Sequence, residues 1–315
     1  MALKTELCDL LEIKKPIIQG GMAWVATGEL AAAVSSAGGL GIIGAGNAPA
    51  DVIEKEIEKV KELTDKPFGL NIMLLSPFAD DIIELAIEKR VPVITTGAGN
   101  PGKHVKRFQE VGSKVIPVVP SVALAKRMER LDVDAVIVEG TEAGGHIGEL
   151  ATMALVPQVV DAVEIPVIAA GGIADGRGLA AVIALGAAGA QIGTRFVCSK
   201  ECTASEEFKK AIVGARDRDA VVTGRSTGHP VRNLKNKLTK EIDRLEKEGA
   251  EPEKIEELGS GKLRDAVIEG DVQEGSVMAG QISGMISEIK NVEEIMEEIL
   301  LAAEKTIRDS FDLLE

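Results

Sequence analysis

One histidine of this chain follows a run of small residues, in a position where an imidazole can do chemistry. His146 closes the segment 139–146 (EGTEAGGH), which comes directly after a β-branched run. Histidine is the one side chain whose unperturbed pKa suits proton transfer near neutrality. The glycines make this backbone flexible enough to approach a flat ligand. We therefore predict a catalytic role for His146.

The other histidines and the cysteines carry weaker signals. His104 falls at the polar start of a predicted helix, where a solvated side chain is the simpler interpretation, and His229 lies in a loop, where a place at the rim of a pocket stays open. Cys8, Cys198 and Cys202 are odd in number and lack CxxC spacing, so neither a disulfide framework nor a zinc site is indicated. We interpret Cys198 as an ordinary buried thiol and predict no metal site.

Two glycine-rich loops predict a phosphate site. Gly171-Gly172 follows the seventh β-branched run of the chain, and Gly193-Thr194 lies in the eighth. Bare backbone N–H groups of such loops form the phosphate cradle common to many barrels. The alternative is that these glycines only make room for tight turns.

Eight β-branched runs must position these loops. They are 16–19, 40–43, 68–73, 91–95, 115–119, 135–138, 166–169 and 190–196. Helical patterns lie between them, such as 27–37, 52–63, 80–88, 122–131, 152–163 and 178–185. The runs lack an alternating polar face, which is typical of parallel strands buried on both sides. We predict an α/β fold, a TIM (β/α)8 barrel, with the site at the C-terminal ends of the strands; a doubly wound sheet is the alternative.

The chain changes character after this series. We predict that 1–197 forms the barrel, that 198–290 is a helical insertion or lid without a clear strand–helix phrase, and that 291–315 is a helix packing back on the barrel. The apolar side of that helix consists of Val292, Ile295, Ile299, Leu300 and Ile307.

Charge and composition exclude several classes of function. A net charge of −14 argues against nucleic acid as the main partner, because phosphates would be repelled. The N-terminus lacks a signal-peptide pattern, and no apolar stretch is long enough for a membrane span, so a cytoplasmic protein is expected. The chain contains no tyrosine, which removes every mechanism that needs a phenol as proton donor.

Several motifs resemble a known family. The segments 19–25, 71–73, 142–146 and 170–176 look like those of the nitronate monooxygenase (2-nitropropane dioxygenase) superfamily, whose members are FMN-binding TIM barrels. The segments 71–78, 117–123, 228–232 and 275–281 are closer to FabK-type enoyl-acyl-carrier-protein reductases (enoyl reductase II). The second set includes parts of the insertion, so the resemblance covers almost the whole chain.

The resemblance implies a cofactor, substrates and site residues. It implies bound FMN, NADH or NADPH as electron donor, and trans-2-enoyl thioesters of an acyl-carrier protein as substrates in fatty-acid elongation. It places His146 beside flavin and substrate, and Met278 and Ser276 near the substrate. The flavin contacts expected are Gly21, Met22, Ala23, Asn71, Glu139, Gly144, Gly145, Ala170, Gly171, Gly172, Gln191, Gly193 and Thr194.

A local excess of positive charge bears on the carrier protein. Residues 195–240 hold 11 Lys and Arg against 5 Asp and Glu. Acyl-carrier proteins are acidic, so a basic face containing Arg225, Arg232, Lys235 and Lys237 would suit docking; an ordinary solvated surface is the alternative.

Two rival functions stay open at this point. The first is a nitronate monooxygenase, with the same barrel and flavin and a histidine base that removes a proton from a nitroalkane. The second is a non-catalytic barrel that binds flavin or a sugar phosphate, against which His146 on its glycine loop argues. The sequence leaves open NADH against NADPH, acyl-chain preference, reactivity with oxygen, a homodimer, and a monovalent cation, for which no site is apparent.

Overall fold

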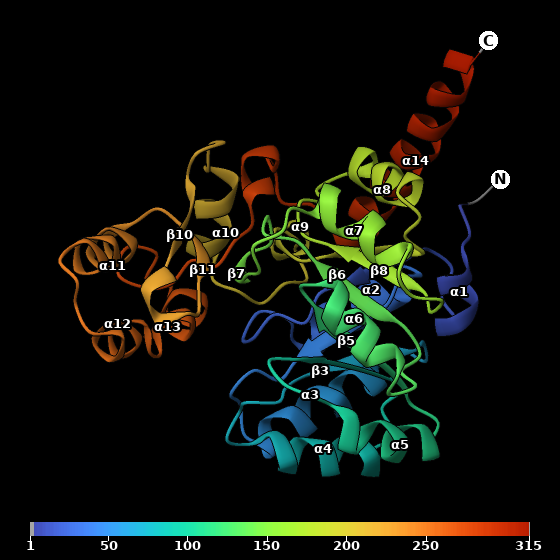
Figure 1. Cartoon of the computed structure of the whole chain (residues 1–315), viewed down its shortest axis with the longest axis horizontal. Coiled ribbons are helices and arrows are strands. Elements are labelled where there is room, and N and C mark those ends of the chain that lie inside the picture. The colour runs from blue at the N-terminus through green and yellow to red at the C-terminus, as the bar shows by residue number, and fades with distance from the viewer. Residues whose placement is uncertain (1–2, 315) are drawn as a thin grey trace.

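Eight parallel strands close into a barrel at the centre of the molecule (Figure 1). In this computed structural model, which describes residues 3–314, they are β1 (Ile17–Gln19), β2 (Gly41–Gly44), β3 (Phe68–Met73), β4 (Val93–Gly97), β5 (Lys114–Val119), β6 (Val136–Glu139), β8 (Val167–Ala170) and β9 (Gly189–Ile192). Neighbouring strands follow the order β1-β9-β8-β6-β5-β4-β3-β2. A parallel bridge between Ile18 and Leu40 closes the ring from β1 to β2. The predicted TIM barrel is confirmed.

Apolar side chains fill the inside of the barrel, so it is a packed core. The strands contribute branched residues that are fully buried, among them Ile42, Ile116, Ile137 and Ile168. The short helix α1 (Glu6–Leu11) adds Leu7 to the same cluster. A Cβ atom placed on Gly189, where β9 begins, would lie 2.5 Å from Leu7, so α1 closes the end of the barrel opposite the predicted site.

Amphipathic helices cover the outside of the barrel. They are α2 (Gly28–Ser36), α3 (Ala50–Leu63), α4 (Ala79–Glu88), α5 (Gly102–Glu110), α6 (Val122–Glu129), α7 (Thr152–Val160) and α8 (Gly176–Ala184). On α3 the buried residues are Ile53, Ile57 and Val60, the spacing of one helix face. Because the strands are covered by helices outside and by side chains inside, they lack a polar face.

Two strands differ from the predicted ranges by more than one residue at an end. The run 91–95 predicts the fourth strand too early, because Pro92 has no N–H for the ladder and β4 begins only at Val93. The run 190–196 is wrong in its second half, where Thr194–Val197 forms the helical turn α9. All four residues of that turn are buried. A short buried apolar run does not by itself distinguish strand from helix.

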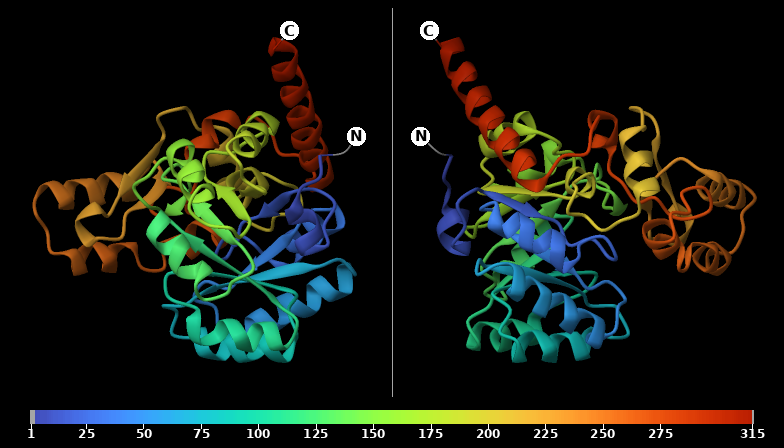
Figure 2. Two further views of the ribbon diagram at one scale, coloured as in Figure 1. Left: turned by 45° about the vertical axis from the view of Figure 1, so that its right-hand side comes forward. Right: turned by 180° about the vertical axis from the view of Figure 1, so that it is seen from behind.

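The segment after the barrel forms a lobe at one side of it (Figures 1 and 2). Its helices are α10 (Glu206–Val213), α11 (Lys237–Lys247), α12 (Pro252–Gly259) and α13 (Lys262–Ile268), with 3-10 turns η1 (Arg225–Thr227) and η2 (Gln281–Met285). It also contains the strands β10 (Ala220–Thr223) and β11 (Val231–Leu234), which the prediction of a helical insertion does not include. They form a three-stranded antiparallel sheet with β7 (Gly145–His146) from the barrel loop.

The last helix, α14 (Val292–Phe311), is anchored by its first half and ends in the turn η3 (Asp312–Leu314). Val292, Ile295 and Ile299 are buried, and a Cβ atom on Gly176 of α8 would lie 2.3 Å from the Ala303 nitrogen. The rest of α14 projects from the body (Figure 2), so Ile307 is exposed although the helical pattern assigns it to the packed side. None of the helices in residues 3–314 has the length and apolar character needed to cross a membrane.

His104 is buried in α5, contrary to the solvated side chain expected from the sequence. Only 6% of it is exposed, and its Nδ1 has no hydrogen-bond partner among the described residues. Burial lowers the pKa of His104, and the positive charges of Lys103 and Arg107 lower it further, while Asp80 and Glu84 act in the opposite direction. The imidazole is therefore neutral in the folded protein near pH 7.

This burial predicts a pH-dependent stability. The pKa of His104 is lower in the folded chain than its usual value of 6.5. As the pH falls through 6.5, His104 therefore binds a proton in the unfolded chain before it does so in the folded chain. The free energy of unfolding decreases as a result. Between pH 8 and pH 5, we expect the melting temperature of the His104→Leu variant to fall less than that of the unmodified protein. The exposed His229→Leu is the control. Parallel melting curves for His104→Leu and the unmodified protein would contradict the prediction.

Candidate functional site

Three neighbouring strands bring the glycine loops together at one end of the barrel. Because β8, β9 and β1 are adjacent in the sheet, the loops after Ala170, Ile192 and Gln19 lie next to one another. Gly20 donates its N–H to the Ile192 carbonyl (3.0 Å), which joins two of these loops directly. The C-terminal ends of parallel strands are where barrel enzymes bind their ligands.

The loop after β8 has a backbone that only glycine adopts easily. Gly171 and Gly172 are both left-handed, with φ of 86° and 77°. A Cβ atom on Gly171 would lie 2.9 Å from the Gly140 carbonyl oxygen, so any side chain there would clash with backbone. Two successive left-handed glycines leave N–H groups free of side-chain cover, which fits an anionic group such as a phosphate.

The loop after β1 is packed tightly against β3 and β9. A Cβ atom on Gly21 would lie 2.2 Å from that of Asn71, whose amide donates to the Thr95 hydroxyl (2.9 Å). Met22 reaches the loop after β9, with its sulfur 3.3 Å from a Cβ position on Gly193. The predicted flavin contacts from these loops, including Ala23 and the buried Gln191 and Thr194, therefore come together at one end of the barrel. Their contact with flavin stays a prediction.

His146 stands in the small sheet of the lobe. It belongs to β7, where it pairs with Val231 of β11, while Gly145 pairs with Arg232. The Ile147 N–H extends the contact by donating to the Pro230 carbonyl (3.1 Å). His146 is thus positioned by the lobe as well as by the barrel strand that precedes it.

The surroundings of His146 favour its neutral form. Desolvation by the surrounding protein lowers the pKa of His146, although the residue is still in contact with solvent. A positive charge on His229 would lower that pKa further. His229 is exposed and stands two residues before the strand partner of His146. The two imidazoles therefore face the same region, which agrees with a place for His229 at the rim.

Glu139 is a second titratable group at this end of the barrel. It ends β6 and pairs with Ala170 of β8, so it lies beside the left-handed glycines. Burial raises its pKa to about 7, so near neutrality much of it is protonated. A protonated carboxyl donates a hydrogen bond and does not repel an anion. This chemistry fits its predicted place among the flavin contacts.

A segment of the lobe returns across the site. The Gly280 N–H donates to the Thr194 hydroxyl (3.0 Å), and a Cβ atom on Gly144 would lie 2.7 Å from the Ala279 carbonyl carbon. Met278 is half-buried, with its sulfur 3.5 Å from a Cβ position on Gly145, so it lies beside the His146 loop. Its place near the substrate stays a prediction. Ser276 is buried and donates to the Asn233 side chain (2.6 Å), so its role toward substrate stays a prediction.

Two residues that hold the His146 loop are absent from the predicted site. The Glu142 carboxylate accepts from the Thr152 N–H and hydroxyl, both at 2.9 Å, at the start of α7. Arg232 is 5% exposed and donates to backbone carbonyls, so its assignment to a basic docking face is wrong. The sequence offers no signal for Arg232, because a buried and an exposed arginine look alike in it.

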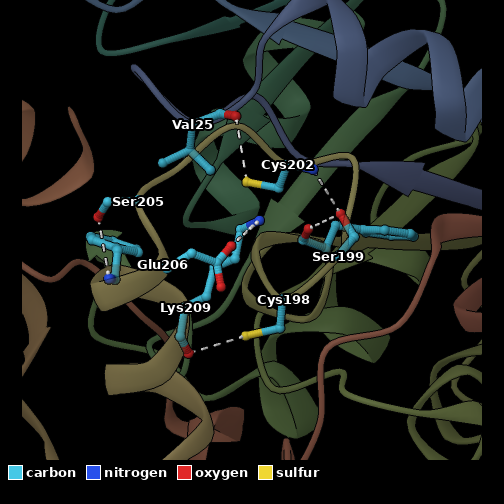
Figure 3. Close-up of polar contacts among 9 residues, drawn as sticks. Val25, Cys198, Ser199, Cys202, Ser205, Glu206 and Lys209 are labelled. Carbon is cyan, nitrogen blue, oxygen red and sulfur yellow. Dashed lines mark hydrogen bonds and ion pairs between the residues drawn. The ribbon is translucent and has the colours of Figure 1, made fainter. Parts of the chain in front are cut away.

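Cys198 is the inert thiol expected from the sequence. Its sulfur faces the Lys209 carbonyl (3.9 Å), while Cys202 faces the Val25 carbonyl (Figure 3). Burial raises the pKa of Cys198 to about 12, so it does not act as an acid near neutrality. In residues 3–314 no three His, Cys, Asp or Glu side chains gather in a way that could hold a metal ion.

Comparison with known proteins identifies similar chains. A family model described as nitronate monooxygenase matches residues 4–302. The structure resembles FabK from Thermotoga maritima, with a TM-score of 0.96 and 52% identity over 99% of both chains. A probable nitronate monooxygenase from Staphylococcus saprophyticus is 37% identical over 89% of this chain and 92% of its own. A (3aS,4S,5R,7aS)-5-hydroxy-7a-methyl-1-oxo-octahydro-1H-indene-4-carboxyl-CoA dehydrogenase from Mycobacterium tuberculosis is 33% identical over the full length of both.

The left-handed glycines allow a matched test of the phosphate cradle. Gly172 and Gly112 have similar φ values, 77° and 91°, but Gly112 lies far from the site and has nothing within 4 Å of a Cβ position. Valine at either position meets the same backbone strain, about 1–2 kcal/mol. We expect both variants to fold with similarly lowered melting temperatures, and only Gly172→Val to lose flavin absorbance on gel filtration. Flavin retained by Gly172→Val, or lost equally by Gly112→Val, would count against the cradle.

Proposed function

This chain belongs to the nitronate monooxygenase family and is a flavin-dependent oxidoreductase. We propose that it reduces trans-2-enoyl thioesters of an acyl-carrier protein. The electron donor would be NADH or NADPH, and the reaction would serve fatty-acid elongation. The observation that carries this proposal is the likeness to FabK from Thermotoga maritima, which extends over 99% of the chain and so includes the lobe.

The site residues match the needs of this reaction. Gly171, Gly172, Gly193 and Thr194 would hold the phosphate of FMN, which supplies hydride to the substrate when reduced. Saturation of the thioester also needs a proton at Cα and a donor for the negative charge that develops on the thioester oxygen. His146 would give that proton or that hydrogen bond, since a neutral imidazole still carries one N–H. No tyrosine competes for the role, and the Cys198 thiol is buried.

The lobe offers a surface for an acidic carrier protein. The end of β11 and the start of α11 line a cavity of about 280 Å³, and Lys235 and Lys240 belong to its lining. Both lysines are exposed, and within residues 3–314 neither has a salt-bridge partner, whereas Lys237 pairs with Glu274 (3.6 Å). Unpaired cations in a chain of net charge −14 suit an acidic partner.

The second candidate function is nitroalkane oxidation. It is favoured by the family model and by the Staphylococcus saprophyticus relative, both described as nitronate monooxygenase. His146 would then remove a proton from the nitroalkane, and no nicotinamide would be needed. Anaerobic addition of NADH to the purified yellow protein separates the two candidates: loss of the flavin colour supports the reductase, and persistence of the colour supports the oxygenase.

Replacement of His146 by alanine tests the proposed reduction. We expect flavin to stay bound and to lose its colour with NADH at an unchanged rate, because that half-reaction needs no acid from β7. Turnover of crotonyl thioester should fall roughly 10²–10⁴-fold, the usual worth of a positioned general acid. Stopped-flow absorbance follows both halves. Equal slowing of flavin reduction and flavin reoxidation would mean that His146 only shapes the pocket. Unchanged reoxidation by the thioester would mean that another residue is the acid, and His229 would be the next residue to replace.

Charge reversal at the lobe tests the carrier surface. In Lys235→Glu/Lys240→Glu we expect KM for crotonyl carrier protein to rise roughly tenfold, because like charges disfavour docking, with KM for crotonyl coenzyme A unchanged. The control is Lys106→Glu/Lys126→Glu, an equal charge change at exposed lysines of α5 and α6. The defect should shrink at high salt. Equal effects in both double variants would show that only net charge matters.

A further inference from the structure

We propose that Arg232 is a positioning residue, which sets the place of His146 by holding the loop between β6 and β7 against the lobe. The inference rests on the proposed role of His146 and concerns how that imidazole is held. Arg232 acts through the backbone of the loop, because its guanidinium donates to the carbonyls of Thr141 and Ala220.

The guanidinium of Arg232 is bound to the loop at one point. Its Nε and Nη2 both donate to the Thr141 carbonyl, at 3.1 and 2.8 Å, and its Nη1 lies 3.4 Å from the Ala220 carbonyl on β10. Thr141 comes two residues after the end of β6, and His146 five residues later. The arginine therefore connects β10 and β11 of the lobe to the segment that carries the imidazole.

Few other contacts hold the loop: the Gln281 N–H of the lobe donates to the Glu142 carbonyl (2.9 Å), and the Glu142 carboxylate binds the start of α7. β7 is only two residues long, and its pairing with β11 involves Gly145 and His146 alone, extended by the bond from Ile147 to Pro230. Gly144 and Gly145 on its path give the backbone wide freedom. The Thr141 N–H is bound to the Leu150 carbonyl (2.8 Å), so the Arg232 contact acts on the opposite side of the same peptide segment.

Stability alone does not explain a charged side chain at this position. Arg232 is buried and forms no salt bridge among the described residues; its partners are backbone carbonyls. Burial of a guanidinium without a carboxylate partner carries a desolvation cost that an apolar side chain of similar volume does not have. The planar fork of arginine does what an apolar chain cannot, because two N–H groups on one carbonyl fix both its distance and its orientation.

Direct contact with a carrier protein does not explain it either, because the side chain is shielded from solvent. Arg225 provides the comparison within the same lobe. It joins the lobe to the segment that follows β7, through Glu149 (3.2 Å), but both side chains are exposed. An exposed pair of this kind contributes little, about 0–1 kcal/mol. Arg225→Gln is thus a control that removes an arginine and a contact between the lobe and the neighbouring segment on the other side of β7.

The first experiment measures the loop itself. Amide hydrogen exchange of a peptide covering 140–147, followed by mass spectrometry on the flavin-loaded enzyme, should be faster in Arg232→Met than in the unmodified protein, with the barrel peptides unchanged. Arg225→Gln should leave this exchange unchanged. Unchanged exchange in Arg232→Met would overturn the proposal whatever happens to activity, and so would faster exchange throughout the chain.

The second experiment asks whether the effect passes through His146. With crotonyl thioester we expect kcat of Arg232→Met to fall roughly 10–100-fold, since a displacement of about 1 Å has costs of that order, while KM stays within about twofold. Arg232→Lys should recover part of kcat, because one ammonium reaches the Thr141 carbonyl without the fork. In a His146→Ala background Arg232→Met should have no further effect on turnover.

The possible results distinguish the role of Arg232 from the role of His146. Additive losses in the double variant, or a loss in KM alone, would show that Arg232 shapes the pocket independently and would overturn its positioning role. Normal turnover in His146→Ala would instead remove the proposed function of His146, and the exchange measurement would still decide whether Arg232 holds the loop. If Arg232→Met fails to fold, Arg232→Lys carries the same exchange and turnover measurements.

Discussion

The antiparallel pairing between β7 and β11 is the contact on which the candidate site depends. Through it, a loop that starts at the end of a barrel strand becomes the edge of a sheet whose other two strands belong to the lobe. The imidazole of His146 is therefore held by backbone hydrogen bonds from a segment more than 80 residues away in the chain. Because β7 is so short, the side chains around it, above all Glu142 and Arg232, contribute to the geometry of the site.

The barrel supplies the other half of the site, and it does so through strand order. Since β8, β9 and β1 are neighbours, three loops distant in sequence present their backbones side by side. Glycine is required at this junction because Gly21 meets Asn71 and Gly171 meets Gly140, where no side chain fits. Gly21 and Gly171 are closely packed, and Gly171 and Gly172 have a left-handed backbone. Both features leave peptide N–H groups without side-chain cover, which suits an anion.

The candidate site therefore has two structural parts, the barrel loops and a segment of the lobe. A flavin-binding barrel with a histidine on its catalytic face suits both enoyl reduction and nitroalkane oxidation. The segment 276–281, which the lobe brings to Thr194 and Gly144, is a part of the candidate site that does not come from the barrel.

The sequence by itself determined the barrel, because eight buried runs with glycine at their ends are local patterns. It also singled out the two glycine loops and His146, whose roles stay predictions. It misplaced His104 and Arg232, and it left β10 and β11 unseen, because burial and strand pairing depend on distant segments. An arginine that donates to Thr141 and one that faces water have the same local sequence signal. Only the tertiary structure decided that the loop of His146 pairs with the lobe, since backbone hydrogen bonds between strands carry no side-chain signature.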